Sequence, residues 1–226
     1  MSELSPFHEV HVKAGAVLRE VEGWLMPEHY GDPAGERRAA GETLAVFDRS
    51  FCSRVRLEGK EAGRLLERLA GEDLGLAEGG QKLVSFNGAP DARALVQRQD
   101  DSWVVIGAPG GREKLLAQLE AHRAGLKAKI SDETFSTAMV ALRGPKALPL
   151  LKDKLPFDLS ELPAGGLIIE SFFFMRFVIA ELIDGCGPGA LITLPAKTAG
   201  MAWDMLVKYG RPYGAVMAGT AAWQAL

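Results

Sequence analysis

The first half of the chain alternates short strand-like segments with amphipathic helical ones. Hydrophobic and charged residues alternate over residues 53–57, which predicts a half-buried strand, and the leucines of residues 60–70 fall on one helical face. Residues 111–124 show the same helical spacing. Turn signals at Asn87-Gly88 and Asp100-Asp101 separate three further predicted strands, over residues 82–86, 93–98 and 103–108.

The second half repeats this order of elements. Pro145 favours the start of a helix after a strand over 136–143, because a first-turn residue needs no N–H donor. Strand–helix–strand–strand groups therefore occur twice, which predicts an α+β fold of two ferredoxin-like subdomains. The approximate subdomains are residues 1–50 with 136–226, and residues 51–135. Later strands are expected near 167–174, 177–183 and 191–194, and helices over 196–209 and 219–226.

The first fifty residues carry shorter patterns. A proline, helical spacing of hydrophobic residues and a closing glycine predict a helix over residues 6–14. Residues 23–27 are interpreted as an apolar loop ending in a proline. The remaining expected elements are an extended segment over 17–21, a helix over 34–41 and a strand over 44–48.

Composition narrows the class of protein. The 226 residues are 47% hydrophobic and 24% charged, as in ordinary globular proteins, and the net charge of −3 gives no reason to expect nucleic acid. The polar N-terminus does not resemble a secretory signal. The apolar stretch 167–180 is interrupted by charged residues and is too short to span a membrane. A cytoplasmic protein is therefore expected.

Cysteine and histidine spacing predicts no metal site. Cys52 and Cys186 are the only cysteines, and they form no CxxC pair. Cys186 lies in a Gly/Pro-rich stretch that is interpreted as a turn, with a reactive thiol as the alternative. His8 and His11 share a helix face without a third ligand nearby in sequence, so we interpret them as surface or capping residues.

Several stretches match, in the same order, the motifs of one family. They are Phe7–Ala16 for H-x-x-x-G-A, Gly23–Pro27 with Tyr30 for GW-x-MP-x-x-Y, Ala45–Ser50 for GLFD-x-S, Val55–Ala62 for V-x-GPDA, and Ala141–Ala147 for AL-Q-GP-x-A. The chain therefore resembles the folate-binding region of the glycine-cleavage T-protein (aminomethyltransferase) family. The resemblance implies three subdomains that hold tetrahydrofolate in a central channel. The C-terminal β-barrel of the family is expected to be absent from these residues.

The resemblance also identifies a candidate for the catalytic carboxylate. The family carries it in a GG-x-x-DD hairpin motif, where it orients the aminomethyl substrate. Here the two acidic positions fall on Ala92 and Arg93, and Asp91 lies one residue earlier. A one-residue slip in a strand turns a side chain to the opposite face. Asp91 is thus the catalytic candidate only if the turn is shortened, and otherwise it is a solvated turn residue.

Four further ligand positions of the family have lost their polar groups, and a tyrosine position beside one of them has changed to an aspartate. The glutamate that pairs with the pterin falls on Gly187, the nearby tyrosine on Asp184, and an asparagine on Gly107. An arginine and an aspartate fall on Ala218 and Gly219. A pterin bound here would leave N–H donors unpaired, which costs about 1–3 kcal/mol each. We therefore expect ordinary aminomethyl transfer to be lost.

Aromatic residues offer a last set of cofactor-binding candidates. Phe51, Phe86 and the run at 172–174 are expected either to wall the folate channel or simply to lie in the core. Three functions remain open: a folate-fold protein without standard catalysis, an active tetrahydrofolate-dependent enzyme with a rearranged site, and a subunit that completes a partner enzyme. A folate-dependent iron–sulfur maintenance role ranks below these because its signature is missing. An apolar edge left by the missing barrel predicts self-association.

Overall fold

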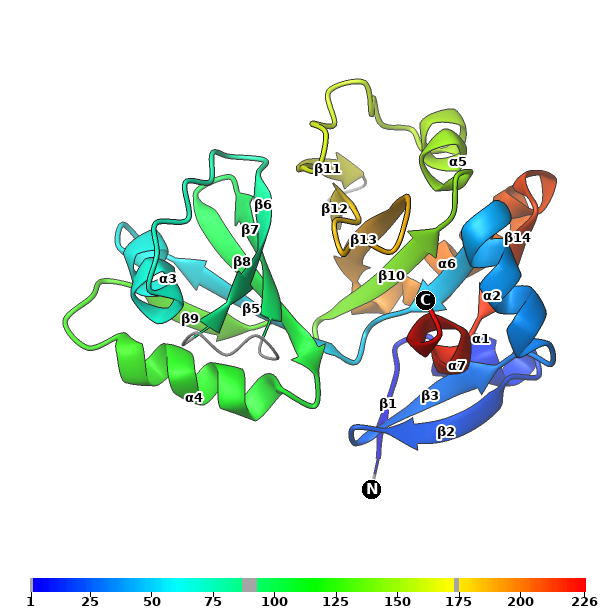
Figure 1. Ribbon diagram of the computed structural model, residues 1–226, viewed down its shortest axis with the longest axis horizontal. Coiled ribbons are helices and arrows are strands. Elements are labelled where there is room, and N and C mark those ends of the chain that lie inside the picture. The colour runs from blue at the N-terminus through cyan, green and yellow to red at the C-terminus, as the bar shows by residue number, and fades with distance from the viewer. Residues whose placement is uncertain (1, 87–92, 173–174) are drawn as a thin grey trace.

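The computed structural model describes residues 2–86, 93–172 and 175–226 and divides into two lobes (Figure 1). The smaller lobe is a five-stranded sheet in the order β6-β7-β8-β5-β9, with helices α3 and α4 on one face. Its path β5-α3-β7-β8-α4-β9 is ferredoxin-like, with β6 added at the edge. The bounds are β5 Cys52–Glu58, α3 Ala62–Ala70, β6 Gln81–Ser85, β7 Arg93–Gln99, β8 Ser102–Pro109, α4 Arg112–His122 and β9 Lys129–Asp132.

The larger lobe holds a six-stranded sheet in the order β11-β12-β13-β10-β4-β14. The path β10-α5-β12-β13-α6-β14 repeats the ferredoxin-like pattern, with β11 added at the edge and β4 inserted beside β14. The expected α+β fold with two such units is confirmed. The bounds are β4 Leu44–Asp48, β10 Thr137–Arg143, α5 Ala147–Lys154, β11 Leu167–Phe172, β12 Met175–Glu181, β13 Gly189–Pro195, α6 Ala199–Gly210 and β14 Ala215–Ala218.

A three-stranded sheet and three helices complete the larger lobe. Residues 23–27, expected as a loop, instead form most of strand β3, which pairs with β2 on one side and β1 on the other. Its Pro27 is tolerated in this small sheet because the pairing with β2 is irregular nearby. The bounds are β1 Glu3–Leu4, α1 His8–Lys13, β2 Val17–Val21, β3 Trp24–His29, α2 Pro33–Glu42 and α7 Thr220–Gln224.

Side chains of the smaller sheet alternate between its two faces, and each face contributes to a different hydrophobic core. Val55 and Leu57 pack against the helices α3 and α4, whereas Val104 and Ile106 face the larger lobe. The sheet is therefore buried on both faces. The face opposite the helices α3 and α4 borders the space between the lobes.

Two segments, between β4 and β5 and between β9 and β10, connect the lobes. Arg54 forms hydrogen bonds with both of them. The Arg54 side chain is 1% exposed, and its guanidinium donates to the carbonyl oxygens of Ser50, Cys52, Thr134 and Thr137. Its Nε donates to Thr137 Oγ1 at 2.7 Å. Burial lowers the pKa of Arg54, partly offset by nearby acidic groups. The segments β4–β5 and β9–β10 are thus held at one point.

Within the described ranges, no helix combines the length and apolar character needed to cross a membrane.

Candidate functional site between the lobes

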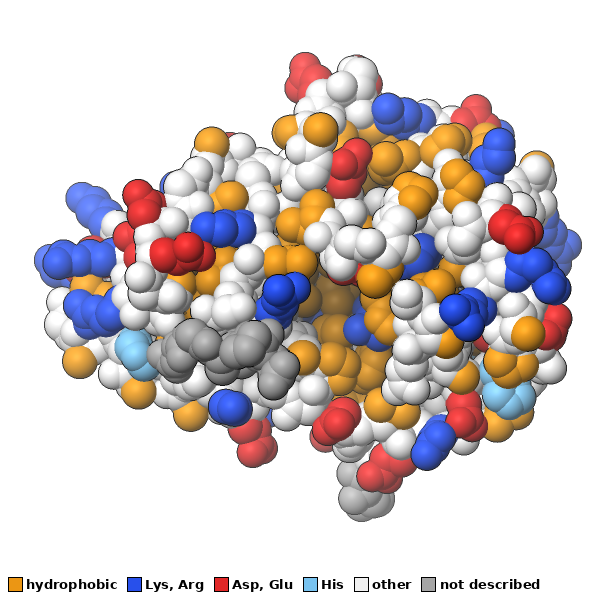
Figure 2. Space-filling model, in the orientation of Figure 1, with side chains coloured by type: hydrophobic (Ala, Val, Ile, Leu, Met, Phe, Trp, Pro, Cys, Tyr) orange, Lys and Arg blue, Asp and Glu red, His pale blue; other side chains and the backbone are white. Residues whose placement is uncertain are grey.

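A hollow lies between the two lobes and is open on the face shown in Figure 2. Hydrophobic side chains line much of it, and basic side chains are visible inside. A buried hydrophobic cluster between the lobes joins Ile106 of β8 to Phe47, Met139 and Val178 of the larger sheet. Such a lining suits a flat, largely apolar ligand whose orientation is set by a few polar groups.

Two arginines stack against Trp223 of helix α7. The Trp223 ring centroid lies 4.2 Å from Arg49 Cζ and 4.6 Å from Arg143 Cζ. Arg49 Cζ also lies 4.8 Å from the ring centroid of Phe51. A guanidinium is attracted to the negative face of an aromatic ring, so the stack holds both cations in place. Arg49, Arg143 and Trp223 were not predicted from the sequence; the available signal was an arginine at the carboxyl end of each of two largely apolar strands, directly after β4 and as the last residue of β10.

The structure brings two of the candidate cofactor-binding residues together on Arg143. Asp184 forms an ion pair with Arg143, whose side chain is 1% exposed, and the Gly187 carbonyl accepts from Arg143 Nη1 at 3.4 Å. The other Asp184 oxygen accepts from the backbone N–H of Cys186 at 3.1 Å. Arg143 Nε is buried and has no hydrogen-bond partner among the described residues. The Asp184 carboxylate and the Gly187 carbonyl are therefore both engaged by groups within the protein.

Two positions that carry polar ligands in the resembled family have no room for a side chain here. A Cβ on Gly107 would lie 2.4 Å from Ser53 Oγ and 3.2 Å from Leu115 Cδ2. A Cβ on Gly219 would lie 2.2 Å from the carbonyl oxygen of Glu28 in β3. Close packing of neighbouring elements thus replaces the ligand side chains at both places. At these two positions the described residues therefore supply no side-chain ligand.

The remaining candidates are distributed among different surroundings. Phe51 is buried in a small cluster with Trp24 and Met26. Phe86 is buried among the residues that pack on α3 and α4, so it lies on the helix side of the sheet and away from the hollow. Asp91 lies outside the described residues. Phe172, expected in the core, is 41% exposed at the end of the edge strand β11.

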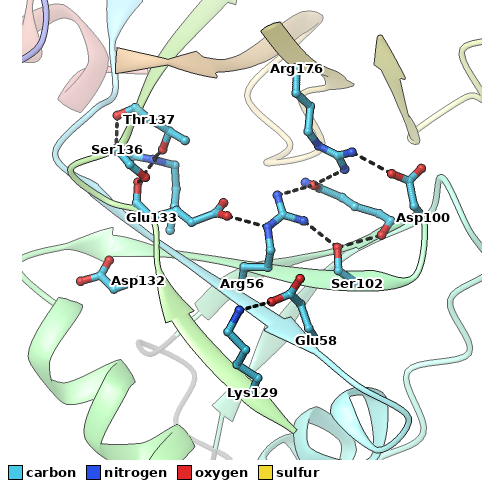
Figure 3. A network of polar contacts seen from close by, with 12 residues as sticks. Arg56, Glu58, Asp100, Ser102, Lys129, Asp132, Glu133, Ser136, Thr137 and Arg176 are labelled. Atoms are coloured by element: carbon cyan, nitrogen blue, oxygen red, sulfur yellow. Dashed lines mark hydrogen bonds and ion pairs between the residues drawn. The ribbon is translucent and has the colours of Figure 1, made fainter. Parts of the chain in front are cut away.

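A separate polar cavity lies between the lobes, and Figure 3 shows the network beside it. Arg56 Nε donates to Glu133 at 2.6 Å, and Arg56 Nη1 donates to Ser102 at 2.6 Å. From the other lobe, Arg176 Nη1 donates to Asp100 at 2.7 Å. The cavity has a volume of about 150 Å³.

His11 is the centre of a buried polar network, so its interpretation as a surface or capping residue is wrong. Its ring is 0% exposed; Nε2 lies 3.0 Å from Asp48 Oδ2, and Nδ1 lies 2.7 Å from the Tyr30 hydroxyl. The inward face of the short helix α1 places His11 edge-on to Trp203, with centroids 4.9 Å apart. Burial removes these groups from any ligand, so the network joins structural elements.

Among residues 2–86, 93–172 and 175–226, no group of three or more His, Cys, Asp or Glu side chains is arranged to hold a metal ion.

The family model described as the GCVT N-terminal domain matches residues 7–226. The chain is 35% identical over 162 residues to an aminomethyltransferase of Rubrobacter xylanophilus, covering 70% of this chain and 44% of that protein. It is 30% identical over 230 residues to an aminomethyltransferase of Chlorobium luteolum, covering 97% and 61%. The chain therefore spans about three fifths or less of the length of these curated relatives.

Solved structures show the same fold. The glycine cleavage system aminomethyltransferase T from Bartonella henselae superposes with a TM-score of 0.87 at 22% identity, covering 98% of this chain and 61% of that chain. A chain of heterotetrameric sarcosine oxidase from Corynebacterium sp. U-96 superposes with a TM-score of 0.60 at 17% identity, covering 81% and 93%. The expectation that the 226 residues lack the C-terminal part of the longer relatives is confirmed.

Proposed function

Because the chain belongs to the GCVT N-terminal domain family, we propose that it serves one-carbon metabolism without catalysing the standard aminomethyl transfer. One observation carries the proposal: Arg143 engages both Asp184 and Gly187 in the loop that holds the pterin-pairing glutamate of the resembled family. The loop therefore offers no free carboxylate among its described groups. A ligand of the hollow would meet arginine and tryptophan instead.

This arrangement disfavours tetrahydrofolate in particular. A pterin presents adjacent N–H donors, and a buried donor without an acceptor costs about 1–3 kcal/mol. Guanidinium groups such as those of Arg49 and Arg143 carry only donors, so they cannot replace the missing acceptor. Tetrahydrofolate is therefore expected to bind weakly, because its N–H donors would face the N–H donors of the arginines.

Calorimetric titration with tetrahydrofolate tests the proposal. We expect a dissociation constant weaker than about 1 mM, which corresponds to a binding free energy of only about 4 kcal/mol in magnitude. Micromolar affinity would contradict it and favour the alternative of an active tetrahydrofolate-dependent aminomethyltransferase centred on Asp91. That alternative requires folate-dependent activity that is lost in Asp91→Ala and kept in Asp204→Ala, a control on the exposed side of α6.

A second candidate function is that of a subunit, and helix α6 carries the observation that favours it. Met201, Met205 and Tyr209 recur every four residues and are all exposed, which forms an apolar stripe along the helix. Exposed apolar stripes of this kind often mark association sites. The matching chain of sarcosine oxidase belongs to a heterotetramer, and the structural match covers 93% of that chain. Light scattering of the purified chain is expected to show self-association. A strictly monomeric species contradicts self-association through this stripe.

A further inference from the structure

The polar cavity beside the network of Figure 3 lies at the carboxyl end of β7, whereas the resembled family carries its catalytic carboxylate in a motif that precedes this strand. Strand β7 begins at Arg93 and ends at Gln99, which lines the cavity. Seven residues of strand span about 20 Å. The cavity therefore lies about one strand length from the start of β7, and anion binding there does not depend on whether tetrahydrofolate binds.

The cavity walls come from both lobes and carry an excess of positive charge. Three arginines, Arg54, Arg56 and Arg176, line it together with a single acidic residue, Glu133. Arg56 lies in β5 of the smaller lobe and Arg176 in β12 of the larger lobe. The rest of the lining is Gln99, Val104, Ser136, Thr137, Val178, Thr193, Leu194 and Pro195, which includes three hydroxyl groups.

The protein's own groups do not use all of this hydrogen-bonding capacity. Arg176 donates to Asp100 at 2.7 Å and to Gln99 at 3.3 Å, but its Nε is buried and has no hydrogen-bond partner among the described residues. The Asp100 side chain is half exposed, so water screens the attraction between its negative charge and Arg176. A buried N–H of a cation without an acceptor is unfavourable, and an acceptor supplied from outside would satisfy it.

We propose that this cavity binds a small oxyanion, a carboxylate or phosphate group, which accepts from Arg176 Nε beside Arg56; Gln99 Oε1 already accepts from both guanidinium groups at 3.3 Å. The planar guanidinium presents a fork of donors that matches the two oxygens of such a group. The volume of about 150 Å³ corresponds to roughly five water molecules, which suits inorganic phosphate or a carboxylic acid of a few carbons. The anion would contact both lobes at once.

Nuclear magnetic resonance of the wild-type chain provides the first test. Sodium phosphate and sodium acetate are titrated separately, with sodium chloride holding the ionic strength constant because salt screens charges. A saturable shift of the Arg176 Nε–H resonance is expected with at least one of the two anions, and the stronger response distinguishes phosphate from carboxylate. An Nε–H resonance that stays unchanged with both anions overturns the proposal without any need for a variant.

Calorimetry on two matched variants provides the second test. Arg176→Gln is expected to weaken binding of the active anion about tenfold or more, because it removes a charge-assisted contact. Arg112→Gln is the control: Arg112 also pairs with an aspartate and is 37% exposed against 38% for Arg176, but it does not line the cavity. Equal affinity in Arg176→Gln and the wild type, or equal weakening in both variants, contradicts the proposal. If Arg176→Gln fails to fold, Arg56→Lys replaces it, because it keeps the charge and loses the fork.

Discussion

At the scale of single residues, the most consequential side chains are buried polar ones that hold the chain to itself. Arg54 offers five N–H donors to four carbonyl oxygens and one hydroxyl where the lobes connect. His11, which is fully buried, joins Asp48 to Tyr30. Each of these residues satisfies polar groups of segments that are distant in sequence, so local patterns did not predict either role.

Replacing Arg54 by methionine is expected to destabilise the fold by about 3–5 kcal/mol, because several buried carbonyl groups lose their donors together. Urea unfolding monitored by circular dichroism gives the change. Arg19→Met is the control: Arg19 is exposed and pairs with Glu28 on the surface, so the change should stay within about 1 kcal/mol. Similar losses in both variants would show that the buried contacts of Arg54 have no special weight.

Tyr30 predicts a loss of stability at alkaline pH. Burial raises the pKa of its hydroxyl far above the ordinary value of 10.0, and the nearby Asp48 and Glu36 charges raise it further. The unfolded chain therefore releases this proton above pH 10 while the native state keeps it. The stabilisation is complete below pH 10 and decreases above it by about 1.4 kcal/mol per pH unit.

Unfolding free energies of wild type and Tyr30→Phe at pH 9 and pH 11 test this dependence. The variant should be less stable at pH 9, because His11 Nδ1 loses its partner at 2.7 Å. It should nevertheless lose less stability than the wild type between the two pH values. Identical losses would mean that the Tyr30 proton does not distinguish the folded from the unfolded chain.

At the scale of elements, sequence patterns predicted the strands and helices with strong periodicity and missed three of the shortest strands, β1, β9 and β14. The helix expected over 60–70 forms as α3 and that over 111–124 as α4, because their leucines face one core. Strand β14 has four residues and β9 has four, too few for a recognisable period. The loop expected at 23–27 is a strand because its pairing partners, β1 and β2, supply the hydrogen bonds.

Helix α7 lies so close to β3 that only glycine fits at its start. Gly219→Ala would bring Cβ within 2.2 Å of the Glu28 carbonyl, and the required shift is expected to cost about 2–3 kcal/mol. Thermal unfolding measures the change. Gly41→Ala in helix α2 is the matched control, since no atom lies within 4 Å of its Cβ position. That variant should be neutral or slightly stabilised, because alanine favours helices. Unchanged stability in Gly219→Ala would mean that α7 can shift away from β3 without a loss of folding free energy.

At the scale of the whole molecule, the two-unit fold was predictable and the contacts between the units were not. The repeated strand–helix–strand–strand order depends on local periodicity, which the sequence displays. The cavity depends instead on which side chains meet across the interface, and the Arg143 contacts depend on which distant segments meet within the larger lobe. Arg56 and Arg176 are 120 positions apart, and no pattern within either strand indicates that they line one space.

A chain of three glutamines extends this interface, and it predicts how the lobes are coupled. Gln81 donates to the carbonyls of Glu181 at 2.6 Å and Gly166 at 3.2 Å in the larger lobe. Gln97 donates to Gln81, and Gln99 donates to Gln97. We propose that the smaller lobe, approximately residues 51–135, is a separate unit whose opening this chain of amides restrains.

Hydrogen exchange measured by mass spectrometry tests this coupling in Gln81→Ala. Removal of the amide leaves buried carbonyl and amide groups without partners, so about 2 kcal/mol should be lost. The loss of protection should concentrate in β6, β7 and β8, because the larger sheet keeps its own ladder of backbone hydrogen bonds. Gln118→Ala on α4, on the other face of the smaller sheet, should leave both lobes unchanged. An equal loss of protection in both lobes of Gln81→Ala would instead mean that the molecule opens as one unit.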